Sequence, residues 1–382
     1  MNRIRTGVFP ACILIIASAI GPQGEGARSV PEGAKDTLTL AAVGDLMMGG
    51  RVLPFIELYG MHYPFDSTRA TIRSADIAMA NLEAPFTLTG KPFEKTYTFR
   101  VPPDLAPALA DAGFDVMTLA NNHILDFGPE GLTETMETLD RLSVLYCGAG
   151  KDRKQAERAA VLETGGWRVG FLAYSMTYPS EFWADQNRGG AAYPHPRRMQ
   201  RQIASLADSV DAVVVSFHWG GERLPVPREY QRHFAHMAVD AGAHLIIGHH
   251  PHVLQGVEIY RGAFIAYSLG NYVFGSYSMT SQGLMLWAAF QNRALHSVRL
   301  LPMDVNNHRV AFQPRFLRGA AMKACLDEVI RLSGALNEKS LRVDDEGVIV
   351  MNQAGAPVGR HSDCEAADHG EKHSPTDPPS GH

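Results

Sequence analysis

Three histidines stand within four positions in the stretch AHLIIGHHPHV. His249, His250 and His252 follow the apolar run 245–247, whose length and β-branched content are typical of a buried strand. An alternating His-x-His pair can aim both imidazoles at one point, and neutral imidazole is a ligand for zinc, manganese or iron. Taken alone, the cluster is equally compatible with a catalytic site, a solvated histidine tract or chance.

Residues of similar chemistry follow four other predicted strands, at residues 37–43, 76–80, 114–120 and 212–216. All but the first of these strands come after a helix-like segment, as does the strand before the histidines. The residues that follow the four strands are Asp45, Asn81-Leu82-Glu83, Asn121-Asn122-His123 and His218-Trp219-Gly220. In α/β proteins, ligands and catalytic groups gather at the carboxyl ends of strands, where loops converge on a rigid sheet. We therefore expect one shared site at this edge.

Each of these residues also has an ordinary structural role. Asp45 after Gly44 can cap a turn, Asn122 can be a turn residue, and His218 beside Trp219 can be a hydrogen-bonded core histidine. Their convergence on one edge is what favours a common site.

Other residues are expected to support the site without binding metal. His249 is expected to orient its neighbours, because His250 and His252 already form the His-x-His pair. Asp126 lies three residues after His123 and can hold that imidazole in place. Glu222 is left open between a supporting role and a substrate contact. Asn81 and the Ser268 and Asn271 of YSLGN complete this group, with turn formation the alternative for the last two.

The composition of the whole chain bounds the class of protein. With 382 residues, 45% of them hydrophobic, it has room for one large domain or two ordinary ones. The formal charge of −5 and the absence of a run that interleaves Lys or Arg with aromatic residues argue against nucleic acid as a partner.

The two ends of the sequence differ from its middle. Residues 1–19 have the layout of a secretory signal peptide, with Arg3 and Arg5 before an apolar span, so we expect export to the periplasm or the extracytoplasmic surface. Residues 20–36 are typical of a linker, 321–352 of a C-terminal extension, and 353–382 of a disordered tail. The cysteines are scattered, which indicates neither a disulfide framework nor a cysteine metal site.

Six motifs, in order, carry a family resemblance: VGDLMMGG, NLEAPFT, LANNHILDFG, SFHWGGE, GHHPHVLQG and YSLGNYVFG. Together they resemble the CapA family of bacterial capsule synthesis proteins, which is associated with poly-γ-glutamate, over about residues 37–318. That family is itself similar to the calcineurin-like metallophosphoesterases. The resemblance implies a four-layer α/β/β/α metallophosphatase-like sandwich in a single main domain, residues 37–320, with a centre for two divalent ions.

The resemblance also implies roles for individual residues. The implied metal ligands are Asp45, Glu83, Asn122, His218, His250 and His252, with Glu83 about where the bridging acid belongs. His123 matches the histidine that contacts the phosphate or the leaving group. Mixed nitrogen and oxygen ligands suit manganese, iron or zinc better than calcium. Two such ions can clamp the oxygens of an in-line displacement.

The sequence departs from the phosphoesterase pattern at two positions. Where those enzymes usually have Asp-x-His, this chain has Asp45-Leu46-Met47, and a thioether is a poor ligand for a hard divalent ion, so one metal site is expected to be weakened or empty. The second motif has Glu83 instead of Gly-Asp-x-x-Asp, which leaves the geometry of the bridge open.

Two classes of function follow from these features. The first is an exported metal-dependent hydrolase of phosphoester type linked to capsule or poly-γ-glutamate synthesis. The second is a non-enzymatic component of polymer assembly, in contact with a membrane-bound synthesis complex. An anionic polymer would need basic residues near the site, and the nearest in sequence are Arg51, Lys91, Lys95 and Arg223, each of which can also be ordinary surface charge. Hydrolysis of the polymer's amide bond is a third possibility, because a metal polarises a carbonyl as well as a phosphoryl oxygen.

Overall fold

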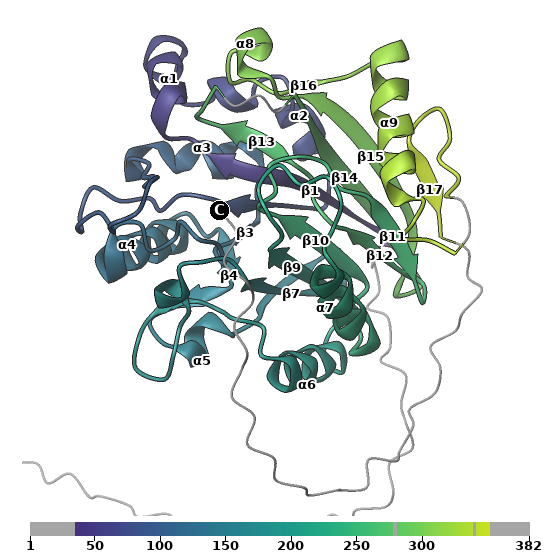
Figure 1. Ribbon diagram of the computed structural model, residues 1–382, viewed down its shortest axis with the longest axis horizontal. Coiled ribbons are helices and arrows are strands. Elements are labelled where there is room, and N and C mark those ends of the chain that lie inside the picture. Colours follow the sequence, from purple (N-terminus) through teal and green to yellow (C-terminus); the bar gives the residue numbers. More distant parts are fainter. Residues whose placement is uncertain (1–34, 278–280, 339–340, 352–382) are drawn as a thin grey trace, which may run out of the picture.

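Two β-sheets lie face to face, with helices on their outer faces (Figure 1). This arrangement comes from a computed structural model that describes residues 35–277, 281–338 and 341–351. The predicted signal peptide, nearly all of the predicted linker and the predicted disordered tail lie outside the described residues. In the described part, no helix combines the length and the apolar character needed to cross a bilayer.

The first sheet has nine strands among the described residues and is mixed. Its path is β16 (Arg315–Phe316), β15 (Ala294–Asp304), β14 (Gln282–Gln291), β1 (Thr37–Met47), β2 (Ile77–Leu82), β3 (Val116–Thr118) and β4 (Leu145–Cys147). Off this path, β13 (Asn271–Phe274) pairs with β1 and β17 (Val348–Val350) pairs with β15. The four strands β1 to β4 run parallel, so they end at the same edge.

The second sheet has six strands. Its order is β11 (Val257–Tyr260), β12 (Ala263–Ala266), β10 (Leu245–His249), β9 (Ala212–His218), β7 (Trp167–Ser175) and β6 (Ala160–Thr164). The central strands β12, β10, β9 and β7 are parallel. A separate two-stranded sheet pairs β5 (Ala149–Gly150) with β8 (Gly190–Ala191).

Nine α-helices accompany the described strands. They are α1 (Leu53–Tyr59), α2 (Arg69–Ile72), α3 (Pro107–Ala112), α4 (Gly128–Arg141), α5 (Arg153–Ala156), α6 (Pro196–Ala207), α7 (Glu229–Asp240), α8 (Asn307–Val310) and α9 (Gly319–Ser333). Short 3-10 turns occupy Gly50–Val52, Tyr63–Phe65, Pro103–Leu105 and Ser180–Phe182.

The side chains of the second sheet alternate between two apolar cores, as the period of two along a strand requires. On β7, Phe171 packs toward the first sheet, whereas Leu172 and Tyr174 belong to the outer core. That outer core is covered by α6 and α7, and α6 contributes the buried residues Met199, Ile203 and Leu206 at the predicted helical spacing. The predicted four-layer α/β/β/α arrangement in one main domain is therefore confirmed.

Several predicted boundaries differ from the structure. β1 continues to Met47, so Gly44 and Asp45 lie inside the strand and not after it. β7 was not predicted, although it is central to the second sheet. The segment predicted as an extension after residue 320 contains most of α9, whose Cys325 and Val329 belong to the main hydrophobic core.

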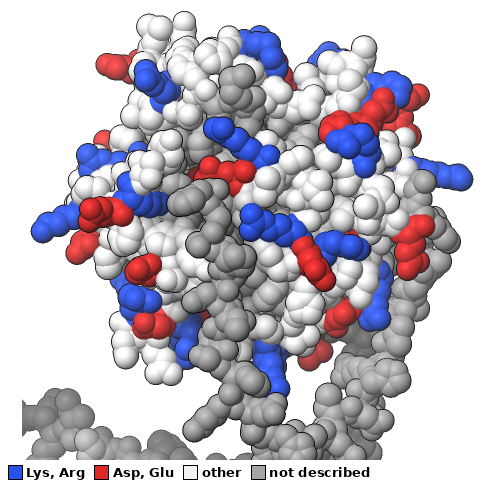
Figure 2. Space-filling model, in the orientation of Figure 1, with Lys and Arg blue, Asp and Glu red and all other residues white. Residues whose placement is uncertain are grey.

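Charged side chains are mixed on the surface. On the face seen in Figure 2, basic and acidic residues are interspersed and do not separate by sign.

Candidate metal centre

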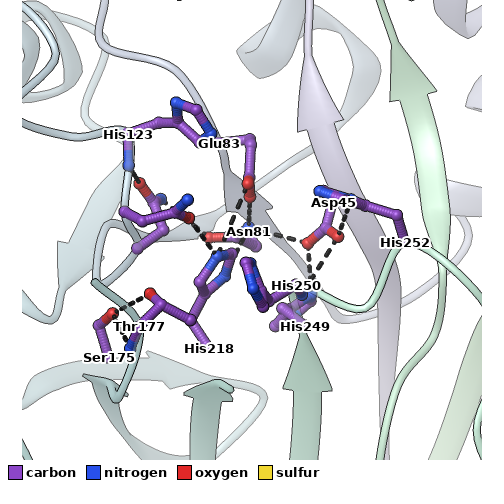
Figure 3. A network of polar contacts seen from close by, with 12 residues as sticks. Asp45, Asn81, Glu83, His123, Ser175, Thr177, His218, His249, His250 and His252 are labelled. Carbon is purple, nitrogen blue, oxygen red and sulfur yellow. Dashed lines mark hydrogen bonds and ion pairs between the residues drawn. The ribbon is translucent and has the colours of Figure 1, made fainter. Parts of the chain in front are cut away.

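The predicted site residues come from both sheets, and not from one sheet edge as the strand pattern suggested. Asp45 lies on β1, Asn81 on β2, Glu83 just after β2, and Asn122 and His123 after β3, all from the first sheet. His218 ends β9 and His249 ends β10, with His250 and His252 in the loop that follows, all from the second sheet. Figure 3 shows the labelled side chains of Asp45, Asn81, Glu83, His218 and His250 gathered where the ends of the two sheets meet.

A local irregularity in β1 presents Asp45 to the site. The register with β2 shifts between Ala42 and Asp45, and the Asp45 N–H donates to the carbonyl of Gly270 at 3.0 Å. A Cβ on Gly44 would lie 1.9 Å from that carbonyl oxygen, so only glycine lets β13 approach β1 this closely. The close approach places Asn271 directly opposite Asp45.

The carboxylate of Asp45 is fully buried and is surrounded by donors. Asn81 Nδ2 donates to Oδ1 at 2.9 Å, and His249 Nδ1 lies 3.2 Å from the same oxygen. His252 Nδ1 lies 3.0 Å from Oδ2, and the backbone N–H of His250 donates to Oδ2 at 3.3 Å. Burial alone would raise the pKa of Asp45, but its contacts with His249 and His252 outweigh burial and hold the pKa well below its usual value. Asp45 is therefore ionised.

Glu83 is equally buried but has fewer donors. Asn81 Nδ2 also donates to Glu83 Oε2, while Glu83 Oε1 has no hydrogen-bond partner in the described part of the chain and lies 3.6 Å from His218 Nε2. Burial and then the charge of Asp45 raise the pKa of Glu83 well above its usual value. A buried oxygen of this kind requires an explanation, and a cation is one that would also reverse the pKa shift.

Two of the histidines beside these carboxylates, His218 and His250, have pKa values that favour the neutral ring. Burial, together with the neighbouring imidazoles, lowers the pKa of His218 well below its usual value and that of His250 to about 3. The rings of His218 and His250 are 4.8 Å apart, and His218 Nε2 lies 2.8 Å from Asn122 Oδ1. His250 Nδ1 is buried and has no hydrogen-bond partner among the residues that the structure describes. Neutral imidazole is the form that binds metal.

The loop that carries His250 and His252 holds both residues in the left-handed region, with φ of 93° and 57°. For residues other than glycine this conformation costs about 1–3 kcal/mol each, so the surrounding contacts must enforce it. His252 Nδ1 contacts both Asp45 Oδ2 and Asn271 Oδ1, and the second contact measures 2.9 Å. Here burial would lower the pKa of His252, but the hydrogen bond and charge of Asp45 raise it to about 9.

These side chains form two overlapping sets of ligand atoms. In the set Asp45, Glu83 and His218, and in the set Glu83, His250 and His252, the atoms lie within 4.8 Å of one another. Glu83 belongs to both sets, as a bridging acid between two ions would. The residues present thus fit a centre for divalent metal, and Asn122 lies close enough to His218 to contribute its amide oxygen.

His123 stands beside this cluster and is held by an acid. Its Nδ1 lies 2.8 Å from Asp126 Oδ2, and its ring is 4.5 Å from that of Phe99. Burial lowers the pKa of His123, against the opposing effect of Asp126. Lys95 was considered as surface charge or as a contact for a polymer, yet its side chain is only 16% exposed and pairs with Asp126. The surface-charge interpretation of Lys95 is therefore wrong, whereas Arg51, Lys91 and Arg223 are exposed.

The chain is similar to one known protein family and to several known proteins. The model of one family, described as bacterial capsule synthesis protein PGA_cap, matches residues 39–276. The chain belongs to this family. It is 30% identical to the capsule biosynthesis protein CapA of Bacillus anthracis over 77% of this chain and 74% of that protein. It is 30% identical to the PGA biosynthesis protein CapA of Bacillus subtilis (strain 168), over 71% and 72%.

Two further similarities concern a more distant relative and a solved structure. The PGA_cap protein is 32% identical to a probable polyglutamine synthesis accessory protein of Mycobacterium tuberculosis, over 65% of this chain and 71% of that protein. It is also similar to the crystal structure of the calcineurin-like phosphoesterase YfkN of Bacillus subtilis, with 12% identity and a TM-score of 0.46, over 78% of this chain and 97% of that one.

The departure at Met47 and the residue Glu222, whose role the sequence left open, can both be located in this PGA_cap protein. Met47 is buried, and its Sδ accepts a hydrogen bond from the N–H of Gly49 at 3.2 Å, so the thioether is engaged within its own turn. Glu222 is exposed after β9, and its charge is among those that raise the pKa of His252.

Two site neighbours were missed from the sequence. Ser175 ends β7 directly opposite His218, and its hydroxyl lies 2.8 Å from that of Thr177 (Figure 3). The signal was the run WRVGFLAYS at residues 167–175, which has the apolar content of a buried strand and ends beside polar residues.

Proposed function

We propose that this PGA_cap protein is an exported metal-dependent hydrolase of phosphoester type that acts in capsule or poly-γ-glutamate synthesis. The observation that carries the proposal is the pair of ligand sets that share the buried Glu83, with Glu83 Oε1 and His250 Nδ1 left without hydrogen-bond partners among the described residues. The membership of the family and the names of the relatives support the link to the polymer.

The ligands of the centre would be Asp45, Glu83, Asn122, His218, His250 and His252. Carboxylate, amide and imidazole ligands suit manganese, iron or zinc. When bound, two such ions would supply Lewis acidity to a phosphoryl oxygen and lower the pKa of water in the site. The protein's own part is to fix the ligands, which it does through Asn81 and Asn121: Asn121 Nδ2 donates to Asn81 Oδ1 at 3.1 Å.

In the proposed reaction His123 acts as the acid. The oxygen of water forms a bond to phosphorus, and the phosphorus–oxygen bond to the leaving group breaks. His123, in its imidazolium form, gives a proton to the departing oxygen and becomes neutral imidazole, and the proton that water loses restores the imidazolium. The contact with Asp126 keeps the ring oriented for this transfer, which is worth about 10²–10⁴-fold in rate for a well-placed acid.

A second function is favoured by Met47. Because its thioether stands where the phosphoesterases usually have a histidine, the same fold could bind an anionic polymer in a membrane-bound synthesis complex without turnover. Under the first proposal the substrate is a phosphoester. The amide linkage of the polymer suggests a variant of that proposal, in which the same centre hydrolyses a γ-glutamyl amide.

The test is the metal content of the purified full-length protein beside a His250→Ala/His252→Ala variant. Both proteins carry the same histidine-bearing C-terminal segment, so any ions bound there cancel in the comparison. About two ions per chain in the wild type and fewer in the variant, with turnover of a phosphomonoester, a phosphodiester or a γ-glutamyl amide by the wild type, would support the hydrolase. One ion per chain in the wild type would indicate that the departure at Met47 weakens one of the two metal sites. Equal metal content in the two proteins, after incubation with manganese, iron and zinc, would exclude a catalytic metal centre at these residues.

A further inference from the structure

Lys95 is the one basic side chain of its segment that turns inward. The segment joins β2 to the turn before α3 and spans residues 86–101, with an isolated pairing of Phe86 and Val101 at its base. Lys91 of the same segment is exposed, whereas Lys95 Nζ contacts Asp126 Oδ1 and the backbone carbonyl of Asn122. Lys95 Nζ also lies 3.2 Å from His123 Nδ1 and 5.0 Å from the centre of the Phe182 ring.

Asp126 is the point at which this segment meets the proposed acid. Its backbone carbonyl accepts from the N–H of Phe93 at 2.8 Å, and its Oδ2 accepts from the N–H of Phe99 at 2.6 Å. The same Oδ2 contacts His123 Nδ1, and Oδ1 is occupied by Lys95. Asp126 is completely buried, so Lys95 supplies the charge that compensates this carboxylate.

Three features therefore depend on one ammonium group. Lys95 fixes the second oxygen of Asp126, and so the plane of the carboxylate that orients His123. It holds the backbone carbonyl of Asn122, whose side chain faces His218. It also anchors residues 86–101 across Asp126, which brings the Phe99 ring against His123.

We propose that Lys95 is a positioning residue for His123, acting through Asp126 and the Asn122 carbonyl and not by contact with substrate. This inference rests on the proposed hydrolase. A residue that binds the substrate anion would change KM, whereas a residue that orients the acid changes kcat, and most for substrates whose leaving group needs a proton.

The first test compares Lys95→Met, Lys95→Arg and the matched control Lys91→Met in the full-length, metal-loaded protein. Lys95→Met should lower kcat for a phenyl phosphate ester by about 10- to 100-fold, the range typical of residues that orient a functional group. The loss should be much smaller for the 4-nitrophenyl ester, whose leaving group needs no proton, and KM should hold. Lys95→Arg should recover part of the loss, and Lys91→Met should behave as wild type. An equal loss on both esters, a rise in KM alone, or identical behaviour of Lys95→Met and Lys91→Met would overturn the proposal.

The second test needs no turnover, so it judges the positioning of His123 even if the wild type proves inactive and the hydrolase proposal fails. The imidazole nitrogen signals of histidine-labelled full-length protein are recorded with chelator and with zinc, and the His123 signals are assigned by their loss in His123→Gln. Lys95→Met should shift or broaden the His123 signals while Lys91→Met leaves them in place. Unchanged His123 signals in a folded Lys95→Met protein would show that Lys95 does not position this ring.

Discussion

Without metal, the protein should lose stability as the pH rises from about 6.5 to 9. The contact with Asp45 raises the pKa of His252 from 6.5 to about 9, although burial opposes the shift. A rise of about 2.5 units corresponds to about 3 kcal/mol of folding stability. Because the folded pKa lies above the unfolded one, this contribution is complete below pH 6.5 and disappears as the pH passes through 9. The lowered pKa of Asp45 reflects the same ion pair with His252, so it is not a second contribution to folding stability.

The assay is urea unfolding of the chelator-treated full-length protein at pH 6.5 and pH 9.5, beside His252→Gln. The variant cannot gain the proton, so its stability should change much less between the two pH values, and the difference between the proteins isolates His252 from other groups that titrate in this range. With zinc or manganese bound, the contribution of His252 to stability should instead increase with pH, because metal binding requires the neutral imidazole. Equal losses in wild type and variant, or no loss in wild type, would refute the assignment of the raised pKa to the pair of His252 and Asp45.

Three shorter predictions concern other parts of the molecule. Asn81→Ala removes the donor shared by the two central carboxylates and should weaken metal binding about 10- to 100-fold in a chelator competition; unchanged affinity would contradict this role. Gly44→Ala should lower the melting temperature sharply, because its Cβ would collide with the Gly270 carbonyl at 1.9 Å, whereas Gly334→Ala, with 3.5 Å to its nearest neighbour, should not. Burial raises the pKa of Cys147 to about 12, so peptide mapping should find it unmodified by a thiol reagent at pH 8 until the protein unfolds.

The sequence was sufficient for the parts of the fold that follow local periodicity. The helix spacing of Met199, Ile203 and Leu206 and the glycine after α3 were predicted, and Gly113 indeed adopts a left-handed conformation with φ of 97°. β1 extends beyond its predicted end because β13 pairs with its last residues, and that pairing joins segments more than 200 residues apart. Periodicity carries no information on such a contact.

The sequence predicted which residues form the candidate site, but not how they are arranged. The residues at or just after the ends of β2, β3, β9 and β10 were identified, and the structure brings them together. The motifs did not predict that Asn81 donates to both Asp45 and Glu83, or that the Lys95 side chain turns inward to Asp126. The first depends on the register of β1 with β2, which pairs Asp45 with Asn81, and the second on how residues 86–101 cross the end of the sheet. Both are decided by contacts between segments that are distant in sequence.

The division of the ligands between two sheets has a consequence for the biogenesis of the protein. Asp45 and Glu83 come from the first sheet, and His218, His250 and His252 from the second, so neither half of the sandwich contains a complete ligand set. Under the proposed function, a nascent chain would have to extend past residue 252 and dock both sheets before these ligand sets could bind an ion. Metal uptake would then be a late event that marks completed assembly, and a bound ion would hold the two sheets together.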